Sequence, residues 1–141
     1  MEERINEKIK EIEIYLEQIY SWLPTDFEEY ERDVKSKAAC EKNLEVISEY
    51  LVDIAIYLIR LKNLRTPNDD ESTFKILAEK NIISDELCKK MISLRGMRNF
   101  IAHRYGEVNN LKVFDAFKEE FRDDVEEFLN SVRKALWLIG L

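Results

Sequence analysis

Apolar residues recur every three or four positions along most of the chain, which is the spacing of helices with one buried face. The first stripe, which stops near Pro24, consists of Ile5, Ile9, Ile12, Leu16, Ile19 and Leu23. The second consists of Leu44, Ile47, Leu51, Ile54, Leu58 and Leu61. We expect the polar stretch 27–43 to lead into this second helix. No stretch alternates apolar and polar residues as a strand does, so the pattern predicts an all-α protein.

The second half of the chain carries a loop and three further predicted helices. Turn-forming residues at 63–72, including a proline, predict the main loop, followed by a short helix over about 72–80. Ser84 is a candidate N-cap for a helix that ends near Gly106. A last helix is expected over about 111–139, with a stripe of Phe114, Phe117, Phe121, Val125, Phe128, Val132 and Leu136. We therefore predict an antiparallel four-helix bundle plus one short helix, in a single domain spanning residues 1–141.

The composition excludes several classes of protein. No run of 18 apolar residues exists, so we expect no membrane span, and the charged N-terminus lacks the apolar core of a signal peptide. Cys40 and Cys88 fall in helical patterns without metal-ligand spacing, so we expect them to be buried and reduced. We accordingly predict a cytoplasmic protein, with no metal and no other cofactor.

The charge is unevenly distributed along the chain. The net charge of −7 argues against a general nucleic-acid coat. Residues 87–106, however, contain no Asp or Glu and carry five positive charges, against a net −12 elsewhere. Those five basic residues are Lys89, Lys90, Arg95, Arg98 and Arg104. The cluster fits a local site for a small anionic target, but charge alone leaves open a chance grouping on a solvated helix.

The same segment holds the only histidine in the chain, His103. At about 100° per residue, Arg98 lies roughly 40° from Leu94, within the inward stripe, and Tyr105 lies roughly 20° from it. A buried charge is costly when unpaired, so Arg98 must face a carboxylate, a cleft or another subunit. His103 lies about 140° around from Arg98, so the two converge only if the helix unwinds or two protomers share the site. Asn99 precedes His103 by one turn and is placed to hydrogen-bond its ring.

Each of these residues also has a simpler structural explanation. His103 could act only as a cation at a helix C-terminus, Arg98 as a salt-bridged residue at the core edge, and Tyr105 as a cap on the core. The sequence offers no Gly-rich phosphate loop, no distinct Ser–His–Asp set and no transition-metal ligand set. Any chemistry here must therefore be metal-free or use an ion bound by carboxylates.

The segment "GMRNFIAHRYGEV", residues 96–108, resembles the signature of the HEPN superfamily, specifically its HepT-like branch. In that signature an Arg-Asn pair is followed after four to six residues by a His and then, one residue on, by a Tyr. Arg98, Asn99, His103 and Tyr105 match this order with four residues between the Arg and the His. The resemblance covers the chain from about Arg32 to the C-terminus and implies a HEPN-like helical bundle.

The resemblance implies a metal-independent endoribonuclease toxin of a type VII-like toxin–antitoxin module. His103 would act as acid and base, Arg98 would stabilise the scissile phosphate, and Asn99 would support them. Arg95, Arg104, Lys89 and Lys90 are the candidates for RNA binding. The toxin would act as a homodimer with both motifs in one cleft, and the products would be a 2′,3′-cyclic phosphate and a 5′-hydroxyl.

The resemblance also implies a protein partner, an antitoxin that is a minimal nucleotidyltransferase and can transfer AMP to Tyr105. Two other classes stay open. One is a non-catalytic module that binds a substrate or partner of such a nucleotidyltransferase, which the acidic body suits. The other is a helical scaffold, which leaves the acid-free basic segment unexplained.

Overall fold

The computed structural model describes residues 1–103 and 109–140, and within these ranges the chain forms helices and no strand. The helices are α1 (Glu2–Trp22), α2 (Phe27–Arg32), α3 (Val34–Leu61), α4 (Asp70–Glu79), α5 (Asp85–His103), α6 (Asn110–Glu119) and α7 (Phe121–Gly140). The all-α prediction is confirmed.

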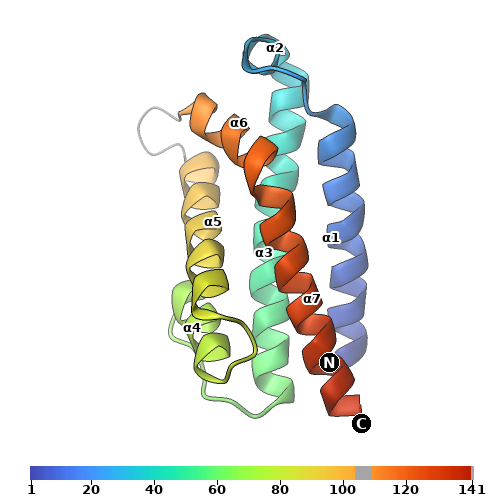
Figure 1. Cartoon of the computed structure of the whole chain (residues 1–141), viewed down its shortest axis with the longest axis vertical. Helices are drawn as coiled ribbons and strands as arrows, with labels where there is room; N and C mark the ends of the chain where they lie inside the picture. The colour runs from blue at the N-terminus through green and yellow to red at the C-terminus, as the bar shows by residue number, and fades with distance from the viewer. Residues whose placement is uncertain (104–108, 141) are drawn as a thin grey trace.

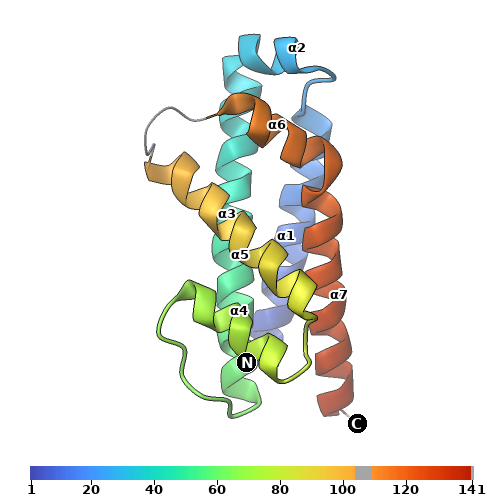
Figure 2. The same cartoon turned by 60° about the vertical axis from the view of Figure 1, so that its left-hand side comes forward.

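The four long helices α1, α3, α5 and α7 run alternately up and down, as an antiparallel bundle does (Figure 1). Helix α4 lies at the end of the bundle where the chain termini meet, and α2 and α6 lie at the opposite end. Turning the molecule shows that α5 crosses α3 obliquely instead of running parallel to it (Figure 2). One side of α5 therefore faces α3 and another is left toward solvent.

The core consists of the predicted apolar stripes. The stripe of α1 is buried from Ile5 to Ile19, that of α3 from Leu44 to Leu58, and all seven predicted residues from Phe114 to Leu136 are buried. Phe74 of the short α4 meets Phe128 of α7 edge to face, with ring centroids 5.8 Å apart, so α4 belongs to the same core. Cys40 and Cys88 are buried and free of disulfides, and burial raises the pKa of the Cys40 thiol to about 11.

The predicted last helix is wrong as one continuous element, because the chain breaks at Glu120 into α6 and α7. The break turns α6 across the end of the bundle, where Phe114 contacts Tyr30 of α2 with ring centroids 5.1 Å apart. The hydroxyl of Tyr20 donates to the Phe117 carbonyl at 2.6 Å beside the bend. The apolar stripe continues through the break, so periodicity alone did not reveal it.

Several helices begin at a side chain that caps their first backbone N–H groups. Asp33 accepts a hydrogen bond from Ser36 N at 3.0 Å and caps the start of α3. This cap separates α3 from α2 within the stretch 27–43, which was expected to lead into the second helix. Asp69 and Ser72 form a capping box on α4. The predicted cap of α5 is confirmed, because Leu87 N donates to Ser84 Oγ at 3.0 Å.

Candidate functional site

The basic segment, residues 87–106, includes most of α5, and the burial of the residues changes along this helix. Its first half is anchored in the core by Leu87 and Met91, and Ile101 is buried again near its end. Between Met91 and Ile101 every residue is half-buried or exposed, and this stretch includes Arg95 and Arg98. The two arginines are placed where α5 crosses α3, and the carboxylates that pair with them come from other helices.

Arg98 faces a carboxylate, one of the three surroundings that its position in the stripe required. Its Nη2 lies 2.5 Å from Oε1 of Glu49 on α3, and its Nη1 donates to Oδ1 of Asn99 at 3.0 Å. The side chain of Arg98 is 21% exposed, against 42% for that of Glu49. The guanidinium therefore lies at the edge of the core with a more exposed carboxylate beside it.

Arg95, proposed from the sequence as an RNA contact, is bound more deeply. Its Nη2 lies 2.8 Å from Asp70 Oδ2 and 3.0 Å from Glu49 Oε1, and its Nε also donates to Asp70 at 2.8 Å. Its Nη1 donates to Ser48 Oγ at 3.2 Å, and the side chain is only 11% exposed. This geometry gives Arg95 the role of joining α5 to α3 and α4.

His103 is the last residue of α5 and is exposed. Because α5 remains helical from Arg98 through His103, the angle of about 140° between them persists and the imidazole lies on another side of the helix. The helix does not unwind before His103. One of the two ways to bring Arg98 and His103 into one site is therefore not observed. Asn99, expected to orient the histidine, accepts a hydrogen bond from Arg98.

The other candidate residues have different positions. Lys89 is exposed, within about 40° of His103 on the helical wheel. Lys90 turns to α7, where its Nζ lies 3.6 Å from Asp124. Burial disfavours the charged form of Lys90, but the carboxylates of Asp124, Glu127 and Glu86 outweigh burial and raise its pKa.

Two candidates, Arg104 and Tyr105, lie outside the described residues, as does Gly106, the predicted end of the helix.

An apolar groove lies between α5 and α6, close to the exposed side of α5. It has a volume of about 380 Å³, and its lining includes Gly96, Met97, Phe100 and Val113. Phe100 is 55% exposed, which is unusual for a phenylalanine. A methyl group at Gly96 would meet nothing within 4 Å beyond its chain neighbours and the backbone of α5, so the helix surface is open at this position.

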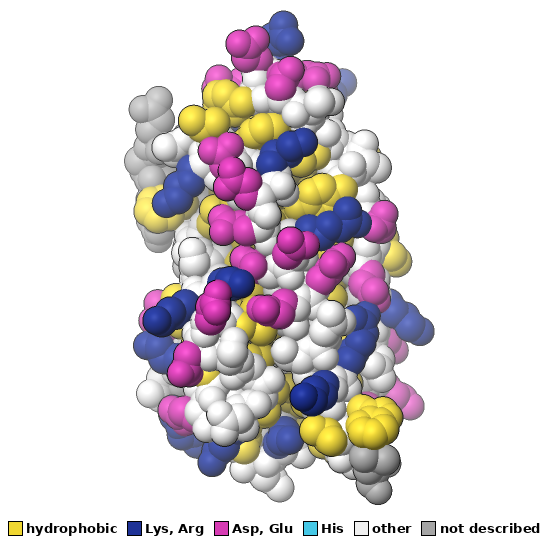
Figure 3. Space-filling view, viewed as in Figure 1, with side chains coloured by type: hydrophobic (Ala, Val, Ile, Leu, Met, Phe, Trp, Pro, Cys, Tyr) yellow, Lys and Arg dark blue, Asp and Glu magenta, His cyan; other side chains and the backbone are white. Residues whose placement is uncertain are grey.

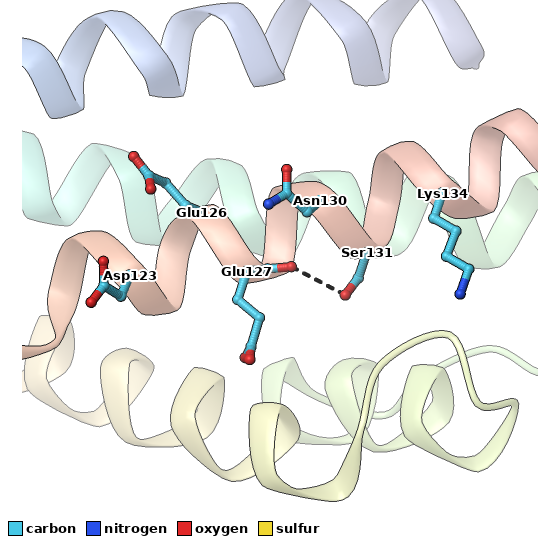
Figure 4. Close-up of a pocket in the computed structure, with 6 residues that line it drawn as sticks. All are labelled: Asp123, Glu126, Glu127, Asn130, Ser131 and Lys134. Atoms are coloured by element: carbon cyan, nitrogen blue, oxygen red, sulfur yellow. Dashed lines mark hydrogen bonds between the residues drawn. The ribbon is translucent and has the colours of Figure 1, made fainter.

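A second hollow, of about 410 Å³, follows the outer side of α7 (Figure 4). It is lined by Asp123, Glu126, Glu127, Asn130, Ser131 and Lys134. Its three carboxylates repel a nucleic acid, and the face that carries α7 shows acidic and basic side chains interspersed (Figure 3). Within residues 1–103 and 109–140, no group of three His, Cys, Asp or Glu side chains is arranged to bind a metal.

Sequence reasoning missed Glu49, Ser48 and Asp70 as partners of the arginines. The one signal was Ser48, a polar residue on the inward side of α3 next to Ile47, and it is 2% exposed. A buried hydroxyl needs a hydrogen-bond partner, and Arg95 supplies it. Nothing in the local pattern indicates which carboxylate meets Arg98, because the crossing of α5 over α3 decides it.

The sequence profile of the ribonuclease HepT-like family matches residues 5–132. The chain belongs to this family. It is 25% identical over 118 residues to the mRNA nuclease HepT of Shewanella oneidensis, covering 84% of this chain and 85% of that protein. Within the described part of the chain, no helix is both long and apolar enough to cross a membrane.

Solved structures show the same relationship. The tri-AMPylated HEPN toxin of Shewanella oneidensis, in complex with its MNT antitoxin, superposes with a TM-score of 0.88 at 25% identity. The match covers 95% of this chain and 99% of that one. The cytosolic protein YutE of Bacillus subtilis, 15% identical, shares the fold with a TM-score of 0.80 over 96% of this chain and 90% of its own. The HepT-like resemblance in the motif is thus confirmed across nearly the whole chain.

Proposed function

We propose that this protein is a ribonuclease toxin of a toxin–antitoxin pair. The observation that carries the proposal is the guanidinium of Arg98, paired at the edge of the core on the same helix as the exposed His103. Both residues belong to a segment within the HepT-like match. Metal-free cleavage of a phosphodiester needs a fixed cation and an imidazole that can reach the same phosphate, and α5 carries one of each.

In the proposed reaction, His103 takes the proton of the ribose 2′-hydroxyl, which attacks the adjacent phosphate. Arg98 stabilises the negative charge that grows on the phosphate oxygens. A second imidazole protonates the 5′-oxygen as its bond to phosphorus breaks, which leaves a 2′,3′-cyclic phosphate and a 5′-hydroxyl. DNA lacks the attacking hydroxyl and would not react.

The second imidazole is His103 of another protomer in this proposal. Arg98 and His103 lie on different sides of a continuous helix, so one chain does not bring both to one phosphate. Gly96 and Phe100 lie within about 60° of His103 on the helical wheel, next to the apolar groove. In a dimer that packs α5 against α5, the exposed phenylalanine would be covered, and each phosphate would lie between the two histidines and within reach of an Arg98 at the edge of this interface.

The proposed partner is an MNT-type nucleotidyltransferase, as in the complex of the Shewanella toxin. That toxin is tri-AMPylated, and Tyr105 is the tyrosine of the matching motif here. An adenylyl phosphate on Tyr105 would add negative charge near the residues that attract RNA and would block the site electrostatically. Mass spectrometry after incubation with the transferase and ATP tests this, with Tyr105→Phe as the control that should stay unmodified.

Cleavage is tested on single-stranded RNA in EDTA, with the wild type, His103→Ala and Arg98→Ala. We expect each variant to lose at least about 100-fold in rate, the usual contribution of a general acid–base or an oxyanion-stabilising group. The same RNA with 2′-O-methyl groups should resist all three proteins. Cleavage that persists in both variants, or that stops in EDTA, contradicts the mechanism.

Dimer formation is tested by sedimentation at micromolar concentration. We expect a dimer for the wild type and a monomer for Phe100→Asp, which places a charge in the proposed interface. A wild type that sediments as a monomer yet cleaves RNA would exclude the shared cleft.

A further inference from the structure

One carboxylate oxygen joins the two arginines of the site. Oε1 of Glu49 lies 2.5 Å from Nη2 of Arg98 and 3.0 Å from Nη2 of Arg95. With Asp70, the four side chains carry two positive and two negative charges, so the cluster is neutral as a whole. A neutral cluster on a chain of net charge −7 does not attract an anion in the way that a free arginine would.

Two of the three guanidinium nitrogens of Arg98 are already engaged. Nη2 contacts Glu49, Nη1 donates to Asn99, and Nε is buried without a hydrogen-bond partner among the described residues. A phosphate held by paired N–H groups needs two neighbouring nitrogens of the guanidinium. Because Nε is buried, the pair left for a phosphate is Nη1 and Nη2, of which Nη2 contacts Glu49 and Nη1 donates to Asn99.

The two arginines depend on Glu49 to different degrees. Arg95 keeps two contacts with Asp70 and one with Ser48 when Glu49 moves away. Arg98 would lose its ion-pair partner among the described residues. The side chain of Glu49 is 42% exposed, so its carboxylate can turn into water at little cost.

We propose that Glu49 is a displaceable counterion that occupies the phosphate position on Arg98 and thereby sets the affinity of the site for RNA. This inference rests on the proposed ribonuclease function. The substrate phosphate takes the place of the carboxylate on Nη2, while Asp70 and Ser48 keep Arg95 in position. Until then, the carboxylate repels any anion that approaches Arg98 and keeps the guanidinium aligned.

The test compares Glu49→Gln with Glu45→Gln. The amide keeps the size of the side chain and an oxygen that accepts from the arginines, but it removes the charge. Glu45 lies one turn earlier on α3 and pairs with Lys42 at 3.8 Å, so its substitution changes the net charge equally and leaves the ion pair of Arg98 intact. Binding of a 2′-O-methyl RNA, which cannot be cleaved, is followed by fluorescence anisotropy over a range of salt concentrations.

We expect Glu49→Gln to bind this RNA roughly three- to fivefold more tightly, the upper part of the range that a half-exposed ion pair can supply. The slope of log K against log salt should steepen by about 0.7, because the site then carries one more positive charge that no carboxylate compensates. Glu45→Gln should stay within about twofold of the wild type. In an Arg98→Ala background the gain from Glu49→Gln should vanish.

Three results would overturn the inference. Weaker binding by Glu49→Gln would make Glu49 a positioning residue that Arg98 needs. Equal gains in Glu49→Gln and Glu45→Gln would indicate a general charge effect. A gain that persists without Arg98 would assign the effect to Arg95. None of these bears on His103-dependent cleavage by the wild type, so the proposed function stands or fails separately.

Discussion

The outer helix α7 and the second half of α5 are both amphipathic by sequence, but they use their inward sides differently. In α7, Phe121, Val125, Phe128 and Val132 are all at most 2% exposed. In α5, the residues between Met91 and Ile101 include two arginines whose guanidinium groups pair with Glu49 of α3. The buried apolar side of α7 stabilises the bundle. In the second half of α5, charged groups at the edge of the core replace part of that apolar burial.

This difference supports the proposed location of the site on α5. A buried phenylalanine needs only the apolar environment that any helix stripe supplies. A half-buried arginine needs particular oxygen atoms at particular distances, so Glu49, Asp70 and Ser48 must come from neighbouring helices. Substitutions in α7 should therefore change stability, and those in the second half of α5 should change activity more than stability.

The largest expected effect is on the core of α7. Phe128→Ala removes a fully buried ring that packs edge to face on Phe74, and it should lower the free energy of unfolding by about 3–5 kcal/mol. Urea denaturation followed by circular dichroism measures this. Trp137→Ala, at a position 65% exposed on the same helix, is the control and should change stability by no more than about 0.5 kcal/mol. Equal losses in the two variants would contradict the assignment of the core.

A smaller effect is expected at the anchor of the site. Arg95→Met leaves Asp70 and Glu49 without their shared cation, but both carboxylates are nearly half exposed and can be hydrated. We expect a loss of about 1–2 kcal/mol in the free energy of unfolding, well below that of a fully buried pair. Arg65→Met, which breaks the exposed pair with Glu79, should leave the urea midpoint unchanged. A loss at Arg95 as large as at Phe128 would mean that the cluster is part of the core.

The smallest expected effect is a pH dependence of stability that arises at Asp69, the N-cap of α4, away from both regions. Hydrogen bonds from the Ser72 backbone and side chain lower the pKa of Asp69. A lowered pKa in the folded state stabilises the protein above the ordinary carboxyl range, and this contribution is lost as the pH falls through the folded-state pKa. Thermal unfolding between pH 7 and acid should show a shallower decline for Asp69→Asn, which keeps the cap but does not titrate. Identical curves would exclude this role.

The sequence by itself determined the helical elements and the sides that they bury. Stripes such as Leu44 to Leu58 and a cap such as Ser84 involve residues close along the chain, so their geometry follows from local spacing. The motif from Arg98 to His103 also involves residues close along the chain, and it was recognised by its resemblance to the HepT-like signature. It also followed that Arg98 could not be buried alone, because an unpaired charge in the core is costly.

Only the tertiary structure decided which groups meet. The break at Glu120 lets Phe114 pack on Tyr30 across the end of the bundle, a contact that no local pattern encodes. The choice of Glu49 as the carboxylate beside Arg98 follows from the angle at which α5 crosses α3. Contacts between distant parts of the chain depend on how whole helices pack, and the periodicity of one sequence does not determine that packing.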